Sequence, residues 1–335
     1  MSSIKPIAVL ISDVHYSVPT LELADNAIRQ AIAKANALDV PLIVAGDLHD
    51  TKANMRAECV NAMIDTFTEV SGAFILRGNH DAINEKSKQH ALNFLAAQDL
   101  SIVSSPTRIY AYDLILIPYE YDIEVLRTYL KTIPKGSTVI MHQGLTSAAP
   151  GEYTHDKTAI SKEDVAGLRV ISGHYHSRQD ITLPEGGLWS YIGNSYTLNY
   201  GEANDPPKGF QVLYDDGSLQ FINTYLRRHT VRNLTFSELN GKLYHITLQT
   251  VNDLILVKLT GTKEELCTVN KVHIAQKLGI MDSFRLDLIP LETTSQQRHI
   301  KSDMAQDVLL DHTIVSLENT SDEQKARLKQ LWRTL

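Results

Sequence analysis

The stretch Ile7-Ala8-Val9-Leu10-Ile11-Ser12-Asp13-Val14-His15 decides the fold and much of the chemistry of this chain. Its first five residues form a continuous apolar run, which predicts a strand that is buried on both faces. Asp13 and His15 follow directly after that run. A carboxylate and an imidazole at the end of a buried strand are well placed to bind a metal ion.

The same arrangement recurs further along the chain. Short apolar runs at residues 42–45, 74–76, 139–141 and 170–171 predict four more buried strands. Each is followed within three residues by a potential ligand; the motifs are Gly46-Asp47, Gly78-Asn79-His80-Asp81, His142 and Gly173-His174-Tyr175-His176. Because such sheets place their active sites at strand ends, these side chains are predicted to form one site.

Helical patterns separate these runs. Apolar residues at helical spacing predict helices over residues 21–38 and 59–70 and near residues 91–97, and a further strand is expected at residues 114–117. Short apolar runs alternating with helices are typical of a sheet covered on both faces, so the predicted fold class is α/β.

The second half of the chain has a different pattern of predicted elements. Residues 210–214 and 219–224 flank the turn at Asp216-Gly217 and predict a hairpin that closes the domain holding the motifs. A small α+β unit follows, and the tail from Ser321 predicts an amphipathic helix. The small unit is expected to contain strands at 254–259 and 284–289 and a helix near 263–278. The predicted domains are a first domain over residues 1–228, which holds all of the motifs, a capping domain over 229–300 and a C-terminal helical segment over 301–335.

Composition describes an ordinary globular protein, with 335 residues, 43% of them hydrophobic and 21% charged. No apolar run is long enough to span a bilayer, and the first residues lack the pattern of a secretory signal. The two cysteines, Cys59 and Cys267, lie outside all motifs. These features predict a cytoplasmic protein with reduced thiols and no membrane partner.

The net charge of −7 lies entirely in residues 1–228, because residues 229–335 carry 13 acidic and 13 basic side chains. The sequence has no stripe of Lys and Arg of the kind that binds nucleic acid. Any DNA binding must therefore use local basic groups, such as Lys52 and Arg56, or depend on a partner. His49 lies two residues beyond Asp47 and is a further candidate for contact with substrate.

The ligand set is suited to hydrolysis of a phosphate ester by two metal ions, which requires one ligand that bridges them. Asp47, alone in its motif, is the obvious bridge. The first ion would be completed by Asp13, His15 and His176, and the second by Asn79, His142 and His174. Oxygen and nitrogen donors without thiolates favour Mn²⁺, Fe²⁺ or Zn²⁺ over Mg²⁺ or Ca²⁺.

His80 is the imidazole that neither ion needs. It could therefore face the substrate and stabilise the reacting phosphorus or protonate the leaving oxygen. Asp81 is expected to accept a hydrogen bond from its ring and fix the tautomer.

In these motifs the chain resembles the calcineurin-like metallophosphoesterase superfamily, and no ligand of that pattern is missing. The resemblance implies a four-layer fold, in which a two-sheet β-sandwich is flanked by helices, with the small α+β unit as a cap. It also implies the metal and acid roles described above.

Three further segments narrow the resemblance to the Mre11/SbcD nucleases, especially the compact phage-type members. Residues 46–50 resemble that family's second motif, although an aromatic residue usually stands where His49 does. Residues 191–195 resemble its Gly-Ser/Thr-Pro segment, with Tyr196 in place of proline, and residues 204–210 resemble the segment that leads into the closing hairpin.

This resemblance implies a Mn²⁺-dependent nuclease with 3′→5′ exonuclease activity on duplex DNA and endonuclease activity on single strands and hairpins. It also implies a homodimer that works with a Rad50/SbcC-like ATPase in DNA end processing, recombination and repair, in a bacterial cytoplasm if phage-encoded. The tail helix would contact the ATPase, or pack on its own domain. The alternatives are a small-substrate phosphodiesterase for nucleotides or cyclic nucleotides and a scaffold without metals.

Overall fold

The computed structural model of the chain describes residues 4–291, except residues 53, 85, 99, 149–155, 240–251 and 279–283. Its first strand, β1 (Pro6–Ile11), contains the predicted apolar run. Side chains alternate across it, so that Ala8 and Leu10 lie in one buried cluster and Val9 and Ile11 in another. Because both faces of β1 are buried, its sequence is apolar at every position.

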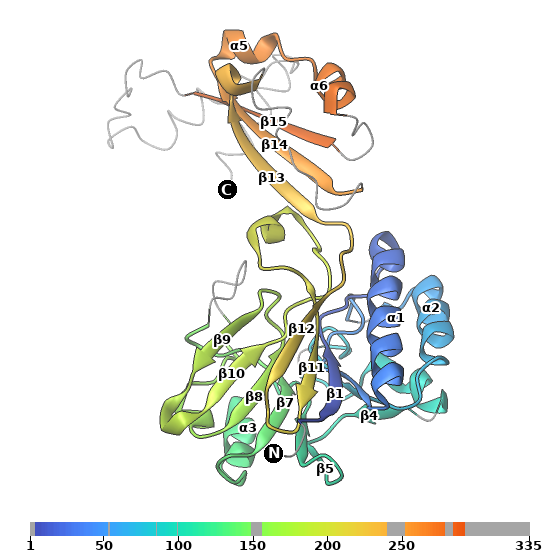
Figure 1. Cartoon of the computed structure of the whole chain (residues 1–335). Helices are drawn as coiled ribbons and strands as arrows, with labels where there is room; N and C mark the ends of the chain where they lie inside the picture. Colours follow the sequence, from blue (N-terminus) through green and yellow to red (C-terminus); the bar gives the residue numbers. More distant parts are fainter. Residues whose placement is uncertain are drawn as a thin grey trace, which may run out of the picture. The chain divides into compact units, whose positions relative to one another are not determined.

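β1 lies inside a six-stranded sheet with the strand order β12-β11-β1-β2-β3-β4 (Figure 1). Strands β1 to β4 pair in parallel, whereas β11 and β12 form an antiparallel hairpin beside β1. The other strands of this sheet are β2 (Leu42–Val44), β3 (Ala73–Leu76), β4 (Ser101–Val103), β11 (Gly209–Tyr214) and β12 (Leu219–Asn223).

A second six-stranded sheet has the order β5-β6-β7-β8-β10-β9, with parallel strands in the middle and an antiparallel strand at each edge. Its strands are β5 (Thr107–Ile109), β6 (Leu114–Ile117), β7 (Thr138–His142), β8 (Arg169–Gly173), β9 (Gln179–Thr182) and β10 (Leu188–Tyr191).

The two sheets pack face to face and helices cover their outer faces. Side chains of both sheets, including Leu10 and Ile140, share one buried cluster. The helices α1 (Leu21–Leu38) and α2 (Ala57–Phe67) pack on the first sheet, and α3 (Ile123–Leu130) packs on the second. The four-layer α/β sandwich that the resemblance implied is therefore confirmed.

Short 3-10 helices connect several of these elements. They are η1 (Val18–Thr20), η2 (Ala91–Gln98), η3 (Glu163–Val165), η4 (Pro184–Gly186), η5 (Tyr200–Asn204) and η6 (Phe236–Glu238).

A three-stranded sheet follows the sandwich in the chain, in the order β13-β14-β15. Its strands are β13 (His229–Thr235), β14 (Leu254–Gly261) and β15 (Phe284–Pro290). The single helix expected near residues 263–278 is wrong, because the structure has two helices there, α5 (Lys263–Cys267) and α6 (Lys271–Leu278). Asn270 lies between them, and its side chain accepts a hydrogen bond from the backbone N–H of His273, as a residue that caps a new helix does.

Contacts divide the chain into two units, one comprising Met1–Leu259 with Asn270–Asp287 and the other Thr260–Val269 with Leu288–Leu335. The boundary predicted at residue 228 stays a prediction. The helical segment predicted over residues 301–335 lies outside the described residues. Among the described residues, no helix has the length and apolar character needed to cross a membrane.

Candidate metal centre

The predicted ligands come from the ends of parallel strands in both sheets. Asp13 follows β1, Asp47 follows β2, Asn79 follows β3, His142 ends β7 and His174 follows β8. Because these strands run in parallel within each sheet and the sheets are stacked, the ligands meet at one edge of the sandwich.

Several of these residues have a backbone conformation that L-residues rarely adopt. The φ angles of Asp13, His15, Asp47 and His174 are +50°, +50°, +52° and +87°. Positive φ at residues other than glycine is uncommon and is concentrated at functional sites. Gly46, with φ +92°, shows how closely the loops approach, because a Cβ there would lie 2.2 Å from Nδ1 of His142.

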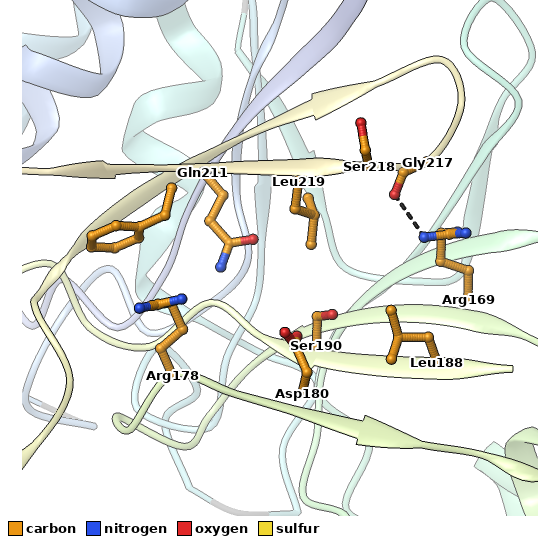
Figure 2. Close-up of a pocket in the computed structure, with 10 residues that line it drawn as sticks. Arg169, Arg178, Asp180, Leu188, Ser190, Gln211, Gly217, Ser218 and Leu219 are labelled. Atoms are coloured by element: carbon orange, nitrogen blue, oxygen red, sulfur yellow. Dashed lines mark hydrogen bonds between the residues drawn. The ribbon is translucent and has the colours of Figure 1, made fainter.

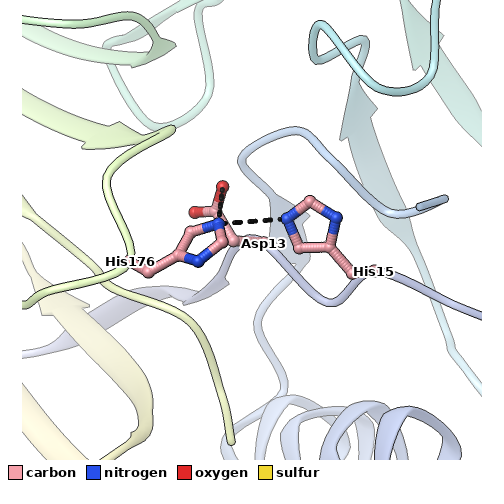
Figure 3. Close-up of side chains that lie close together, drawn as sticks. All are labelled: Asp13, His15 and His176. Atoms are coloured by element: carbon pink, nitrogen blue, oxygen red, sulfur yellow. Dashed lines mark hydrogen bonds and ion pairs between the residues drawn. The ribbon is translucent and has the colours of Figure 1, made fainter. Parts of the chain in front are cut away.

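The first ligand group contains Asp13, His15 and His176 (Figure 3). The two Nε2 atoms of His15 and His176 are 3.1 Å apart, and Oδ1 of Asp13 lies 3.9 Å from Nε2 of His176. Two nitrogens that bind one ion at right angles, with bonds of about 2.1 Å, lie about 3 Å apart. The spacing of the histidines therefore fits a shared metal ion.

The second group contains Asp47, Asn79, His142 and His174. The Oδ1 atom of Asn79 lies 3.1 Å from Nε2 of His142 and 3.0 Å from Nδ1 of His174. Oδ2 of Asp47 is 3.2 Å from the same nitrogen of His142. These distances also fit ligands of one ion. The contacts of Asp47 join it to this group, and its assignment as the bridge between two ions stays a prediction.

Each of the four histidines has an oxygen atom near its other ring nitrogen, and for all but His15 the contact is a hydrogen bond. His142 donates from Nδ1 to the carbonyl of Ala45 at 2.7 Å. The partners of the other three are carboxylates: Asp50 for Nδ1 of His15 at 3.3 Å, Asp156 for Nε2 of His174 at 3.0 Å and Glu202 for Nδ1 of His176 at 2.7 Å. Such partners fix the tautomer and aim the free lone pair at the metal.

The electrostatics of the second group depend on one buried pair. Burial alone would raise the pKa of the Asp47 carboxyl, but the His142 and His80 rings hold it well below its ordinary value. Burial would lower the pKa of His142, but the Asp47 carboxylate raises it to about 9. An ionised carboxylate beside a cationic ring is the arrangement in which a bound cation could take the place of the ring proton.

The predicted partner of the His80 ring is wrong. Its Nδ1 donates to the backbone carbonyl of Asp50 at 2.5 Å. The Asp81 carboxylate instead accepts from three backbone N–H groups, those of Asp47, His49 and Gly78, at 3.0, 2.9 and 2.8 Å. Asp81 therefore ties the second motif to the third, whereas the Asp50 carbonyl sets the tautomer of His80.

Replacing Asp81 by alanine should destabilise the protein strongly. Three buried N–H donors would lose their acceptor, and each unpaired buried donor costs about 1–3 kcal/mol. We expect the free energy of unfolding in urea to fall by about 3 kcal/mol or more. Asp65→Ala, at an exposed position of α2, is the matched control. A loss below about 1 kcal/mol for Asp81→Ala would contradict this role.

The three candidates for contact with substrate differ in their exposure and in their contacts. His49 is only 1% exposed, and its ring contacts the carbonyl of Thr51 at 2.9 Å. This hydrogen bond gives His49 a structural role, and the substrate contact predicted for it stays a prediction. Arg56 is exposed and pairs with Glu58 at 2.9 Å. The contacts predicted for Arg56 and Lys52 stay predictions.

A separate cavity of about 200 Å³ lies at the sandwich edge where β9 and β10 face β11 and β12 (Figure 2). Arg169 donates to the carbonyl of Gly217 at 2.7 Å, and the Arg178 guanidinium lies 4.3 Å from the centre of the Phe221 ring. None of the predicted metal ligands lines this cavity. It is therefore not the site that the histidines form.

A four-layer sandwich with two groups of carboxylate, amide and imidazole donors at its strand ends defines a metal-dependent hydrolase of phosphate esters. The chain belongs to the family described as calcineurin-like phosphoesterase, whose sequence profile matches residues 8–178 and so includes every motif from Asp13 to His176. Members of this family use a dinuclear metal site.

Among curated proteins, the chain is similar to "Putative phosphoesterase 244L" of Invertebrate iridescent virus 6. The two are 26% identical over 211 residues, which cover 59% of this chain and 72% of the viral protein.

The solved structures to which the chain is similar include a dimetal phosphatase from Danio rerio, with 14% identity and a TM-score of 0.44 over 63% of this chain and 93% of that one. The nuclease MPE of Pseudomonas putida has 15% identity and a TM-score of 0.31 over 64% of this chain and 87% of that one. A 5′-nucleotidase precursor from Thermus thermophilus has 12% identity and a TM-score of 0.35 over 64% of this chain and 52% of that one.

Proposed function

We propose that this phosphoesterase is a DNA nuclease that hydrolyses phosphodiester bonds at a two-metal centre. The observation that carries the proposal is the convergence of two groups of potential ligands, one with Asp13, His15 and His176 and one with Asp47, His142 and His174. His80 lies beside them and could itself contact a metal ion together with His15 and Asp50, but neither proposed ion needs it as a ligand. The choice of DNA as substrate is supported by the segments at residues 46–50, 191–195 and 204–210, which resemble those of the Mre11/SbcD nucleases.

Asp13, His15 and His176 would hold one ion, and Asp47, Asn79, His142 and His174 the other. When bound, two such ions neutralise the phosphoryl oxygens and supply a nucleophile from water at neutral pH. The donors are oxygen and nitrogen atoms without sulfur, which suits Mn²⁺, Fe²⁺ or Zn²⁺. Among these, Mn²⁺ is proposed because of the resemblance to the Mre11/SbcD nucleases.

His80 is the proposed acid. Its Nδ1 is occupied by the Asp50 carbonyl, so Nε2 is the nitrogen left to face a substrate. Its ring packs edge-on against His15, with the ring centres 4.8 Å apart, which places it at the border of the first ligand group. From there, Nε2 can donate a proton to the oxygen that leaves phosphorus.

The proposal extends to partners. The net charge of −7 gives the chain little attraction of its own for DNA, which supports a Rad50/SbcC-like ATPase as the source of much of the affinity. A homodimer, 3′→5′ exonuclease activity on duplex DNA, endonuclease activity on single strands and hairpins, a role in end processing and repair, and a cytoplasmic location belong to the same proposal. They rest on the resemblance to Mre11/SbcD.

The test is Mn²⁺-dependent degradation of linear duplex DNA that is labelled separately at each end, with and without the ATPase and ATP. We expect stepwise shortening from the 3′ ends, stimulated by the ATPase. Bis-p-nitrophenyl phosphate and cyclic nucleotides serve as competing substrates in the same experiment. Turnover of these small substrates without any cleavage of DNA, even with the ATPase present, would replace the nuclease by a small-substrate phosphodiesterase.

A further inference from the structure

Two segments that resemble nuclease motifs, residues 191–195 and 204–210, supply no metal ligand. The structure brings a side chain from each of them to one buried carboxylate, that of Glu202. This residue lies in η5, between the two segments, and is 6% exposed. Its contacts link both segments to His176, a member of the first ligand group.

The two oxygens of the Glu202 carboxylate have different partners. Oε1 accepts from Nδ1 of His176 at 2.7 Å. Oε2 accepts from the side-chain amide of Asn194 at 2.8 Å and from the backbone N–H of Leu198 at 2.9 Å, and Nζ of Lys208 lies 3.4 Å from it. Because three donors surround Oε2, the position of Oε1 beside His176 is fixed as well.

Lys208 also holds the backbone of His176. Its ammonium group donates to the His176 carbonyl at 3.0 Å and to the Asp205 carboxylate at 2.6 Å, and the residue is 5% exposed. The backbone N–H of Asn194 donates to the same carbonyl at 3.2 Å. A lysine is almost never so buried unless its charge is paired. Lys208 fixes the backbone carbonyl of His176, and Glu202 fixes its ring.

We propose that Glu202, held by Asn194 and Lys208, is a positioning residue that selects the metal-binding nitrogen of His176. Because the carboxylate accepts the proton of Nδ1, the lone pair of Nε2 is left to face Asp13 and His15. The inference rests on the proposed function, since it concerns the first of the two ions. It gives the segments at 191–195 and 204–210 a role in metal binding without direct ligation.

The test is a Mn²⁺ titration of the full chain, with free Mn²⁺ followed by its paramagnetic resonance signal. We expect the wild type to bind two ions per chain. In Glu202→Gln, one ion should keep its affinity and the other should bind about 10–100-fold more weakly, which is the usual effect of losing such a partner. Asp164→Asn is the control, since this carboxylate pairs with Arg127 away from the histidines and its loss should leave both ions unchanged.

Glu202→Asp provides an independent variant. It keeps the negative charge beside Lys208 but cannot reach His176 as well, so the same selective loss is expected. Thermal unfolding of the metal-free variants separates this effect from misfolding, and Glu202→Asp decides the question if Glu202→Gln does not fold.

The titration distinguishes a failure of this inference from a failure of the two-metal proposal. If the wild type binds two ions and the folded variants bind both within about 3-fold of it, Glu202 does not position His176 and the inference is wrong. If the wild type binds fewer than two ions, the two-metal proposal itself fails and the inference falls with it.

Discussion

Replacing His80 by alanine should leave both ligand groups able to bind Mn²⁺ but slow phosphodiester hydrolysis by about 100- to 10 000-fold. The side chain belongs to neither proposed set of metal ligands, so its removal takes away a proton donor and no ligand. The hydrogen bond that position 80 makes to Asp47, at 2.8 Å, comes from the backbone N–H and survives the substitution. The ligand loop should therefore keep its shape.

The measurements for this variant are Mn²⁺ stoichiometry and the rate of DNA cleavage at saturating Mn²⁺. His90→Ala is the matched control, because His90 is also a half-buried histidine but bonds to Ser104 and to no predicted ligand. Its rate should equal that of the wild type. Loss of bound metal from His80→Ala, or an unchanged rate, would show that this histidine is not the acid.

Replacing Asp47 by alanine should have the opposite signature, with metal binding lost and activity lost as a consequence. Its carboxylate is 3.2 Å from Nε2 of His142 and is the only carboxylate of the second group. We expect the affinity of that group for Mn²⁺ to fall by more than about 100-fold, since a direct ligand should matter more than the outer partners, whose loss costs 10–100-fold.

Asp47→Asn separates charge from shape, because the amide can still contact His142 and accept from the His80 backbone. We expect it to lose most of the affinity as well, since the negative charge is what offsets the divalent ion. Isothermal titration with Mn²⁺ measures both variants, with Asp65→Ala as the control. Full metal occupancy in Asp47→Ala would remove this residue from the site.

The sequence predicts the central strands of the sandwich well, because β1, β2, β3 and β6 are apolar throughout and β7 is apolar from Val139 to Met141, as expected of strands covered on both faces. It does not reveal the edge strands β5 and β9, whose sequences Thr-Arg-Ile and Gln-Asp-Ile-Thr are partly exposed and largely polar. Periodicity also cannot divide the strands between two sheets, and that division came from the resemblance.

The metal ligands could be found because each follows an apolar run, which marks it as a strand-end residue. The carboxylates that bond to these histidines could not be found in the same way. Asp156 and Glu202 reach His174 and His176 from a loop and a short 3-10 helix, so no periodic pattern marks either of them. The role of Asp81 was mistaken for a related reason, since the sequence shows that it follows His80 but not that its carboxylate turns toward the backbone of the preceding motif.

The central claim is that this chain binds two metal ions side by side at the strand ends. A crystal structure with Mn²⁺, using anomalous scattering at the manganese edge, tests it most directly. The account predicts two peaks, one between Asp13, His15 and His176 and the other between Asp47, Asn79, His142 and His174. A single peak, or peaks away from these side chains, would contradict it.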